Sequence, residues 1–406
     1  MGGTRALEVV VVGAGQAGLA VSHGLSVRGI EHVVLERARI AQAWRDRWDS
    51  FTLVTPNWTM CLPGAPYRGP DPDGFAGRGE VVSYLEGYAA SAPVREGVAV
   101  ERLDRSPDGA FRLTTSEGEL RAGTVVVCTG AYQRPHHPAG ADRWPPGIQM
   151  MGTEEYRKPD DVPAGRVLVV GSGQTGAQLA EDLTLAGRDV VLACGRAPWV
   201  PRHPGDRDIV AWLEDTSFFD LPLAALPNPA ARLVANVQAT GRAGGHDLHY
   251  RTLQELGVLL VGRVTGVEEA AGVVRFAPDL AESVAFGDAR YADIRALCAA
   301  DLPQRGLTPP PLADPEPFRA PVVEELPLRD FGAVLFTAGF RPRYTDWVDV
   351  PVFDGAGFPV TVDGTTEVPG QYFCGVHFMR TRRSALLFGV GEDAELVAES
   401  VAARLG

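Results

Sequence analysis

The stretch "VVVVGAGQAGLA" at residues 9–20 decides the fold. Its four valines form a β-branched run, which is typical of a strand buried on both faces. Gly13, Gly15 and Gly18 then follow the pattern G-x-G-x-x-G. In this pattern the glycines permit a tight turn, a close approach of the backbone to a pyrophosphate, and close packing of a helix on the strand. Residues 17–27 are expected to form that helix, whose N-terminal amides would face a phosphate.

The next expected strand, "HVVLER", carries an acid at its end. Glu36 lies 23 positions after Gly13. At this spacing a carboxylate can accept hydrogen bonds from both hydroxyls of a ribose. A glycine-rich turn in an unrelated sheet would not require such an acid. The first loop is therefore predicted to bind a dinucleotide with free ribose hydroxyls, such as FAD.

A near copy, "VLVVGSGQTGAQLA", occupies residues 167–180. Its glycines, Gly171, Gly173 and Gly176, each lie 158 positions after their counterparts in the first loop. The match extends into the following helix, so it indicates a repeated structural unit rather than a chance turn.

The second unit lacks the acid of the first. Cys194 stands where Glu36 stands, Arg196 follows two residues later, and Arg202 comes soon after. A carboxylate would repel a 2′-phosphate, whereas an arginine binds one as a fork. The second loop is therefore predicted to prefer NADPH over NADH, unless Arg196 is only a solvated loop residue. Two dinucleotides in one chain suit hydride transfer from a nicotinamide to a flavin.

The bulk composition excludes several classes of protein. A chain of 406 residues is long enough for two or three domains. The formal net charge of −13 disfavours nucleic acid and anionic membranes as partners. The N-terminus does not resemble a signal peptide, so a cytoplasmic protein is expected. The five cysteines form no CxxC pair, which argues against a metal site and against a dithiol disulfide reductase. Reduced, structural thiols are expected.

Two further segments end a predicted strand with a glycine. "TVVVCTGAYQRP" contains Thr129 and Gly130, and "AVLFTAGFRP" contains Ala338 and Gly339. Both are interpreted as parts of the flavin domain, where the chain crosses near the cofactor.

Near the C-terminus, Gly389 and Gly391 precede a helix that is expected to begin near Glu392 and Asp393. Its N-terminus could face the N1–C2=O edge of a flavin. The alternative is a helix that only packs against the domain.

Taken together, six segments resemble the flavin-containing monooxygenases, in particular their bacterial CzcO-like branch of FAD-dependent oxidoreductases, and more distantly the plant indole-3-pyruvate monooxygenases. The segments are "VVGAGQAGLA", "VVLERARIAQAWRDRWDSFTLVTPNW", "CTGAYQRPHHP", "VLVVGSGQTGAQLAEDL", "TAGFRPRY" and "RTRRSALLFGVGEDA". We expect an α/β fold of two Rossmann-type domains, with the NADPH domain inserted into the FAD domain. The FAD domain would comprise residues 1–160 and 325–406. The NADPH domain would comprise 161–324, with a helical and loop insertion near 205–255.

The resemblance implies a mechanism and a catalytic residue. NADPH would reduce FAD, O2 would add at the flavin C4a, and the resulting (hydro)peroxide would oxygenate a small organic substrate. Asn57, in "TPNW", matches an asparagine that contacts both NADP+ and the flavin edge in relatives. An amide can donate and accept hydrogen bonds without moving a proton. Without the resemblance, Asn57 would be interpreted as a turn residue after Pro56.

The resemblance also implies that Trp44 and Arg45 lie along the flavin and that the backbone of Val100 touches the adenine. The full set of predicted cofactor-binding residues is Gly13, Gly15, Gln16, Ala17, Gly18, Glu36, Arg37, Trp44, Arg45, Asn57, Val100, Thr129, Gly130, Gly171, Gly173, Gln174, Thr175, Gly176, Arg196, Ala338, Gly339, Leu386 and Gly389.

One departure from the family pattern bears on activity. Relatives carry a hinge histidine in a stretch like "HSSEYR", where this chain has Gly152 in "MMGTEEYR". Its loss leaves open an NADPH oxidase or dehydrogenase without oxygen insertion, or a non-catalytic redox-sensing flavoprotein. His136 and His137 could compensate in part.

In the insertion, Trp212, Phe218 and Phe219 could line a substrate cleft or only fill a core. His246 and His249 could be acid–base groups or make ordinary polar contacts. The substrate and the type of oxygenation are left open, as is a homodimer.

Overall fold

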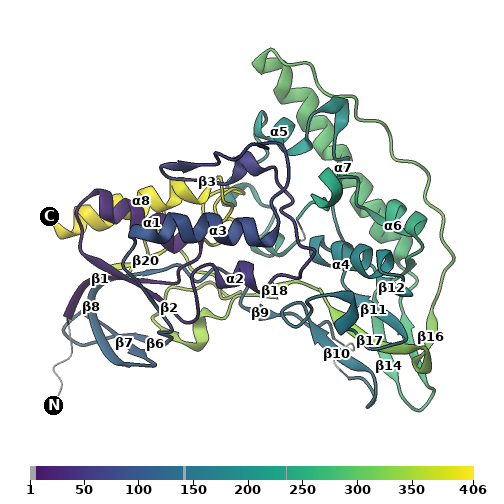
Figure 1. Cartoon of the computed structure of the whole chain (residues 1–406), viewed down its shortest axis with the longest axis horizontal. Helices are drawn as coiled ribbons and strands as arrows, with labels where there is room; N and C mark the ends of the chain where they lie inside the picture. Colours follow the sequence, from purple (N-terminus) through teal and green to yellow (C-terminus); the bar gives the residue numbers. More distant parts are fainter. Residues whose placement is uncertain (1–5, 140–142, 235) are drawn as a thin grey trace.

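The computed structural model of the chain describes residues 6–139, 143–234 and 236–406. Two sheets lie side by side, each with helices packed on it (Figure 1). The described helices are α1 (Gln16–Val27), α2 (Gln42–Arg45), α3 (Arg78–Tyr88), α4 (Gln174–Leu185), α5 (Ile209–Glu214), α6 (Tyr250–Leu256), α7 (Leu280–Asp301) and α8 (Val390–Leu405).

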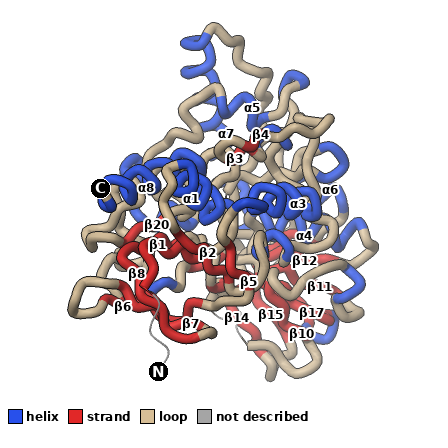
Figure 2. The backbone as a smooth tube through the Cα atoms, turned by 60° about the vertical axis from the view of Figure 1, so that its left-hand side comes forward, coloured by secondary structure: helices blue, strands red, loops and turns tan. Residues whose placement is uncertain are grey.

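The first sheet has eight strands in the order β19-β6-β7-β8-β1-β2-β5, with β20 paired to β8. Their bounds are β1 (Ala6–Val12), β2 (His32–Glu36), β5 (Val94–Glu96), β6 (Val100–Arg105), β7 (Phe111–Thr115), β8 (Gly118–Val127), β19 (Val348–Asp349) and β20 (Gln371–Phe373). The central strand β1 runs parallel to both β2 and β8. Helices α1 and α8 cover one face together (Figure 2). They approach closely because Gly24 has no β-carbon, which would lie 2.8 Å from that of Ala398.

The second sheet has five parallel strands in the order β10-β17-β11-β12-β13. Their bounds are β10 (Gln149–Gly152), β11 (Arg166–Val170), β12 (Val190–Ala193), β13 (Leu259–Val261) and β17 (Phe331–Phe336). Beside it lies a three-stranded antiparallel sheet of β14 (Val264–Glu268), β15 (Val273–Phe276) and β16 (Glu325–Pro327). Two short antiparallel pairs remain: β3 (Cys61–Leu62) with β4 (Ala65–Pro66), and β9 (Arg134–Pro135) with the distant β18 (Phe340–Arg341).

The strand pairing corrects one assignment made from the sequence. The segment 333–342 was expected in the flavin domain, but β17 lies between β10 and β11 in the second sheet. In that position it corresponds to β8, which lies beside β1 in the first sheet.

The chain passes between the two units twice, through β9 and through β18, and these segments pair antiparallel. We therefore propose that the second unit spans about 149–339, wider than the predicted 161–324.

The two units share one apolar core. A single cluster of buried side chains includes Val9 and Val11 of β1 and also Val167 and Val169 of β11. Among the described residues, none of the helices has the length and apolar character needed to cross a membrane.

Candidate functional site: two glycine loops

The first glycine loop joins β1 to α1 and has the shape of a phosphate cradle. Gly13 has a φ of 103°, which favours glycine, and a β-carbon there would lie 2.8 Å from the carbonyl oxygen of Cys128. A β-carbon on Gly18 would lie 1.8 Å from the carbonyl oxygen of Gly13. A β-carbon on Gly15, in contrast, would meet no heavy atom within 4 Å. Gly15 therefore leaves open space above the loop, as a bound pyrophosphate requires.

Glu36 at the end of β2 lies directly beside this loop. Its carboxylate is buried and accepts hydrogen bonds from the backbone N–H of Ala14 (2.9 Å) and of Ala38 (3.0 Å). Each carboxylate oxygen has a further lone pair, so the ribose hydroxyls of a dinucleotide could still be bound. The backbone N–H of Val98 donates to the carbonyl oxygen of Glu36. Val98 is thus a neighbour of Glu36, and contact of the Val100 backbone with the adenine stays a prediction.

The second loop repeats this construction between β11 and α4. Gly171 has a φ of 107°, and a β-carbon there would lie 2.8 Å from Cα of Ala338. A β-carbon on Gly176 would lie 1.9 Å from the carbonyl oxygen of Gly171, and the hydroxyl of Thr337 donates to that oxygen. Residues 337–339, which follow β17, therefore cover the second loop as residues 128–130, which follow β8, cover the first. Ala338 and Gly339 consequently lie at the second loop rather than at the first.

The glutamine that follows each loop connects it to a different part of the chain. Gln16 accepts a hydrogen bond from Nε1 of Trp44 (3.0 Å) and donates to the carbonyl oxygen of Ala385 (3.2 Å). Gln174 accepts from the backbone N–H of Ala239 (2.9 Å) and donates to the carbonyl oxygen of the same residue. The first loop is thus hydrogen-bonded to the C-terminal segment at Ala385, whereas the second is hydrogen-bonded to the insertion at Ala239.

At the end of β12 the structure has no acid. The backbone N–H of Gly195 donates to Oγ of Ser172 (2.8 Å), and the hydroxyl of Tyr250 donates to the carbonyl oxygen of Gly195 (2.5 Å). Burial raises the pKa of Tyr250 and of the Cys194 thiol well above their usual ranges. Both groups stay neutral at pH 7, so the position of Cys194 carries no negative charge.

Of the two arginines expected near this turn, only Arg196 is exposed to solvent. Arg202 is 1% exposed and pairs with Asp208 at 2.6 Å. It also donates to the carbonyl oxygen of Val54 (2.7 Å), and its guanidinium lies 4.3 Å from the ring centroid of Phe75. Because these contacts tie Arg202 to the first unit, it is not available to a 2′-phosphate in this structure.

The two residues predicted to lie along the flavin, Trp44 and Arg45, have different partners in the structure. Trp44 is held by Gln16, as described, but the guanidinium of Arg45 pairs with Glu86 of α3 and donates to the carbonyl oxygen of Ile40. Arg37 is exposed beyond the end of β2. Contact of these two arginines with a cofactor stays a prediction.

Asn57 is buried and braces its own loop. Its Nδ2 donates to the carbonyl oxygen of Asp71 (2.9 Å), and its Oδ1 accepts from the backbone N–H of Ala76 (2.5 Å). One N–H and one lone pair of the amide remain for a cofactor. The structure thus accounts for the turn role of Asn57, and its catalytic role stays a prediction.

Gly152 ends β10 opposite Phe336 of β17. A β-carbon on Gly152 would lie 2.5 Å from the carboxylate of Glu154, an exposed side chain that would have to move aside for a histidine at 152. The ring of His137 stacks on Phe336, with 4.3 Å between the centroids. His137 is therefore the histidine next to this position, whereas the backbone N–H of His136 donates to Gly339 at the crossing.

The insertion and the C-terminal segment pair through their backbones. Arg382 N–H donates to the carbonyl oxygen of Leu221 (3.0 Å), Arg383 N–H to that of Phe219 (3.1 Å), and Leu223 N–H to that of Arg380 (2.8 Å). The next turn closes with a bond from Gly389 N–H to the carbonyl oxygen of Leu386 (3.0 Å), and α8 begins at Val390, two residues before the predicted start.

The aromatic and histidine side chains of the insertion have structural partners. Phe219 packs on Phe388, and Trp212 donates from Nε1 to the carbonyl oxygen of Pro204. His246 pairs with Glu181, and His249 caps α6 by accepting from the N–H of Thr252. These contacts favour packing and ordinary polar roles over cleft lining and acid–base roles.

One residue of interest was not found from the sequence. Among the arginines of "RTRR", Arg380 pairs with Asp393 and Arg383 with Glu214. Arg382 instead lies 4.1 Å from the ring centroid of Phe218, with no carboxylate at ion-pair distance among the described residues. Burial lowers its pKa to about 10. The arginine cluster indicates a cationic segment, but only the folded contacts show which guanidinium stays unpaired.

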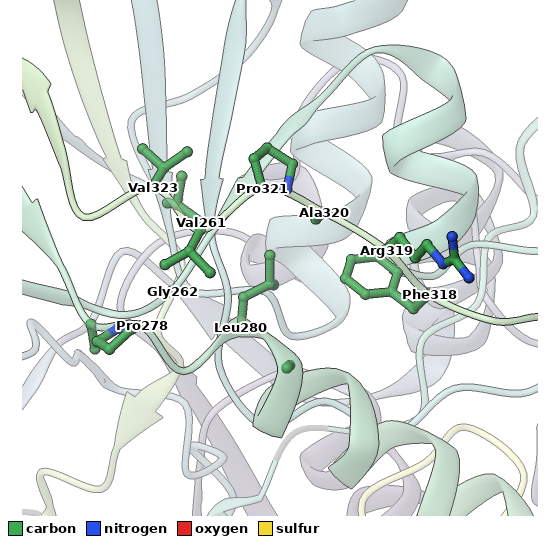
Figure 3. Close-up of a pocket in the computed structure, with 12 residues that line it drawn as sticks. Val261, Gly262, Pro278, Leu280, Phe318, Arg319, Ala320, Pro321 and Val323 are labelled. Atoms are coloured by element: carbon green, nitrogen blue, oxygen red, sulfur yellow. The ribbon is translucent and has the colours of Figure 1, made fainter.

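A groove of about 240 Å³ lies at the carboxyl end of β13, between the start of α7 and residues 318–323 (Figure 3). Val261, Leu280, Phe318 and Pro321 are among the side chains around it. The residues that line the groove lie outside both glycine loops.

Comparison with known proteins agrees with this geometry. Residues 10–216 match the family described as pyridine nucleotide-disulphide oxidoreductase. The chain belongs to this family. It is 28% identical over 400 residues to an uncharacterized CzcO-like oxidoreductase of Geobacillus kaustophilus (strain HTA426), covering 97% of this chain and 98% of that protein. It is 36% identical over 189 residues to the indole-3-pyruvate monooxygenase YUCCA1 of Oryza sativa subsp. japonica, covering 44% of this chain and 45% of that protein. The solved flavin-containing monooxygenase from Stenotrophomonas maltophilia superposes with a TM-score of 0.67 at 20% identity, covering 99% of this chain and 100% of that one.

Membership of the pyridine nucleotide-disulphide oxidoreductase family confirms the prediction of an oxidoreductase. The predicted α/β fold with two dinucleotide-binding units is confirmed by the two loops and by the solved structure. The predicted pair of cofactors, a flavin and a nicotinamide dinucleotide, is confirmed for the family, and both glycine cradles fit such groups.

Proposed function

We propose that the chain is an NADPH-dependent FAD monooxygenase that acts on a small organic molecule. The observation that carries the proposal is the contrast between two otherwise matching loops. The first has a carboxylate beside it, and the second has a neutral thiol and an exposed arginine. A carboxylate suits the free ribose of FAD, and an arginine suits the 2′-phosphate of NADPH.

Bound together, FAD and NADPH would supply hydride transfer and the activation of O2. The protein would contribute position and exclusion of water. Gly15 leaves room for the pyrophosphate of FAD, and Gln16 fixes Trp44 against the loop. Gln174 holds the insertion at Ala239, and the insertion pairs with residues 380–383 of the first unit. Closing the two units over the reacting atoms in this way would keep water out.

Oxygen insertion is supported by the similarity to two monooxygenases, the indole-3-pyruvate monooxygenase of Oryza sativa subsp. japonica in sequence and the Stenotrophomonas maltophilia enzyme in structure. One observation favours a second candidate, an NADPH oxidase that releases hydrogen peroxide. The place of the family's hinge histidine is held by Gly152, and the carboxylate of Glu154 fills the space beside it.

Turnover in 18O2 separates the two candidates. Purified protein should be yellow and should oxidise NADPH faster than NADH. With a panel of amines, sulfides, indoles and ketones, a monooxygenase places one 18O atom in the product for each NADPH consumed. Return of all consumed O2 as hydrogen peroxide, with every substrate in the panel, would establish the oxidase instead.

The role of Asn57 can be tested on the same enzyme. Asn57→Ala should leave the rate of flavin reduction by NADPH unchanged and should raise the fraction of O2 released as peroxide. Asn57→Asp retains the acceptor for Ala76 but loses the donor to Asp71, so it serves as a control for the loop. If both variants release no more peroxide than the parent, Asn57 is only a loop brace.

A further inference from the structure

Helix α7 is inserted between two paired strands, β15 and β16, and it lies against the segment that follows β12. The contact is close at Gly287, where a β-carbon would lie 2.9 Å from the carbonyl oxygen of Ala197. Asp288 accepts a hydrogen bond from Nε1 of Trp199 (2.9 Å) and pairs with Arg251 (2.8 Å). These contacts fix the middle of α7 relative to the turn at Arg196.

On this part of α7, two arginines converge on one aromatic ring. The guanidinium carbon of Arg196 lies 5.8 Å from the ring centroid of Phe286, and that of Arg290 lies 5.5 Å from the same centroid. Arg196 comes from the turn after β12, whereas Arg290 comes from α7, one helical turn beyond Phe286. Two cations that are 94 positions apart in sequence are thus held around one ring by the fold.

The positive charges around this ring are only partly paired with carboxylates. Among the described residues, Arg196 has no carboxylate at ion-pair distance. Within the described part of the chain, Arg290 forms an ion pair with Asp293 alone, at 2.9 Å, and the two side chains are 47% and 63% exposed. Such a surface ion pair contributes little and can be exchanged for a phosphate. The carboxylate of Asp288 is already paired with Arg251.

Arg202, the second arginine suggested by the sequence, is buried against Asp208. In the fold, Arg290 rather than Arg202 is the second arginine that lies near Arg196, because both contact Phe286. We propose that Arg196 and Arg290, positioned around Phe286, together bind the 2′-phosphate of NADPH and set the preference for this cofactor over NADH. This inference rests on the proposed function and adds a second specificity-determining arginine, from the inserted helix, to the second site.

Binding of cofactor fragments tests the inference without turnover. Titration calorimetry on the flavin-loaded enzyme should compare 2′,5′-ADP, which carries the phosphate, with 5′-AMP, which does not. Arg290→Ala should weaken the binding of 2′,5′-ADP about 5- to 10-fold and should leave that of 5′-AMP unchanged, because it removes one charge-assisted contact at an exposed site. Arg290→Lys, which keeps the charge, should restore part of the loss.

Arg295→Ala is the matched control. It removes the same charge from the same helix, but Arg295 pairs with Asp314 and does not contact Phe286. If Arg290→Ala binds 2′,5′-ADP as tightly as Arg295→Ala does, while Arg196→Ala binds it about 10-fold more weakly, the inference is wrong and the NADPH assignment stands. If the parent enzyme binds 2′,5′-ADP and 5′-AMP equally, the NADPH preference itself fails, and the inference with it.

Discussion

The first and second glycine loops share one backbone but differ in what surrounds them. In both, the third glycine of the motif lies against the carbonyl oxygen of the first, and the segment after a neighbouring parallel strand covers the loop. The difference begins at the end of the next strand. There the carboxylate of Glu36 accepts a hydrogen bond from Ala14 in the first loop. Cys194, at the matching position, has no carboxylate, and in the second loop Ser172 is hydrogen-bonded to Gly195 and Tyr250 instead.

This difference separates two roles of the motif. The glycines fix how closely strand and helix can approach, and hence where a pyrophosphate can lie. They do not determine which dinucleotide is bound or which segment closes over it. We expect those properties to come from the strand end and from the glutamine of the loop, which is hydrogen-bonded to Trp44 in one unit and to Ala239 in the other.

The largest expected effect comes from adding one methyl group to either loop. Gly18→Ala and Gly176→Ala would each place a β-carbon within 2 Å of a carbonyl oxygen that belongs to the backbone. Each change should cost about 3 kcal/mol of unfolding free energy, since the strand and helix must separate. Gly18→Ala should lose flavin, seen as loss of yellow colour after gel filtration. Gly176→Ala should retain flavin but lose reduction by NADPH.

Gly15→Ala is the control for the first loop, because its β-carbon would meet no protein atom within 4 Å. It should keep the thermal stability of the apoprotein and weaken only flavin retention. A Gly176→Ala protein that loses its flavin as readily as Gly18→Ala does would show that the two loops do not serve separate cofactors.

Substitutions at the ends of β2 and β12 are expected to lower the stability less than the glycine substitutions do. Glu36→Ala leaves the backbone N–H groups of Ala14 and Ala38 without an acceptor, which should cost about 2 kcal/mol. It should also weaken FAD binding at least 10-fold, measured by flavin fluorescence on dilution. Cys194→Ala removes no charge and should change the affinity for either cofactor less than 2-fold. Equal loss of flavin in both variants would contradict the assignment of FAD to the first loop.

Loss of the Tyr250 hydroxyl should have a smaller effect on cofactor binding than loss of the Glu36 carboxylate. Tyr250→Phe removes the hydroxyl that bridges Ser172 and the carbonyl oxygen of Gly195, one buried and one partly buried hydrogen bond, worth about 1 kcal/mol each. The turn that carries Arg196 would loosen, so the KM for NADPH should rise a few-fold while flavin content stays constant. A change in flavin content would indicate that Tyr250 supports the fold of both units.

Much of this arrangement follows from the sequence, because the deciding features are local. The strand, glycine loop, helix and following strand are contiguous in the chain, and the 158-residue repeat predicts the second unit from the first. Glu36 was found beside the loop because the spacing within one β-α-β unit is nearly constant.

The features that were mispredicted or missed depend on contacts between distant segments. Ala338 and Gly339 follow a strand whose sequence suits either sheet, and only its pairing with β11 places them at the second loop. Arg202 was expected near a phosphate because it is close to Arg196 in sequence, but Asp208 and Val54 hold it elsewhere. The sequence does not point to Arg290 as a phosphate-binding residue, since a charged residue on an amphipathic helix is ordinarily solvated.

The pH dependence of the stability is expected to depend on one histidine in each unit. Burial lowers the pKa of His249, near the second loop, to about 4, and that of His377, which follows β20 in the first unit, to about 4. Between pH 6.5 and 4 the unfolded chain binds more protons than the native one at these sites. The free energy of unfolding should therefore fall as the pH falls through this window, by up to about 1.4 kcal/mol per pH unit for each histidine. Asp393 acts in the opposite direction, because burial raises its pKa to about 6.

Single variants isolate each contribution. His249 caps α6 by accepting from the N–H of Thr252, and protonation would remove this acceptor. His249→Asn keeps a capping side chain without the titration. Urea unfolding at pH 7, 6 and 5 should then show a dependence on pH that is shallower by about 1 kcal/mol per unit than in the parent. His377→Asn should flatten the dependence by a similar amount, since the pKa of His377 is lowered to about 4 as well, and its Nε2 donates to the carbonyl oxygen of Arg232. If only one variant changes the slope, the two units do not unfold together, and their shared core does not couple them.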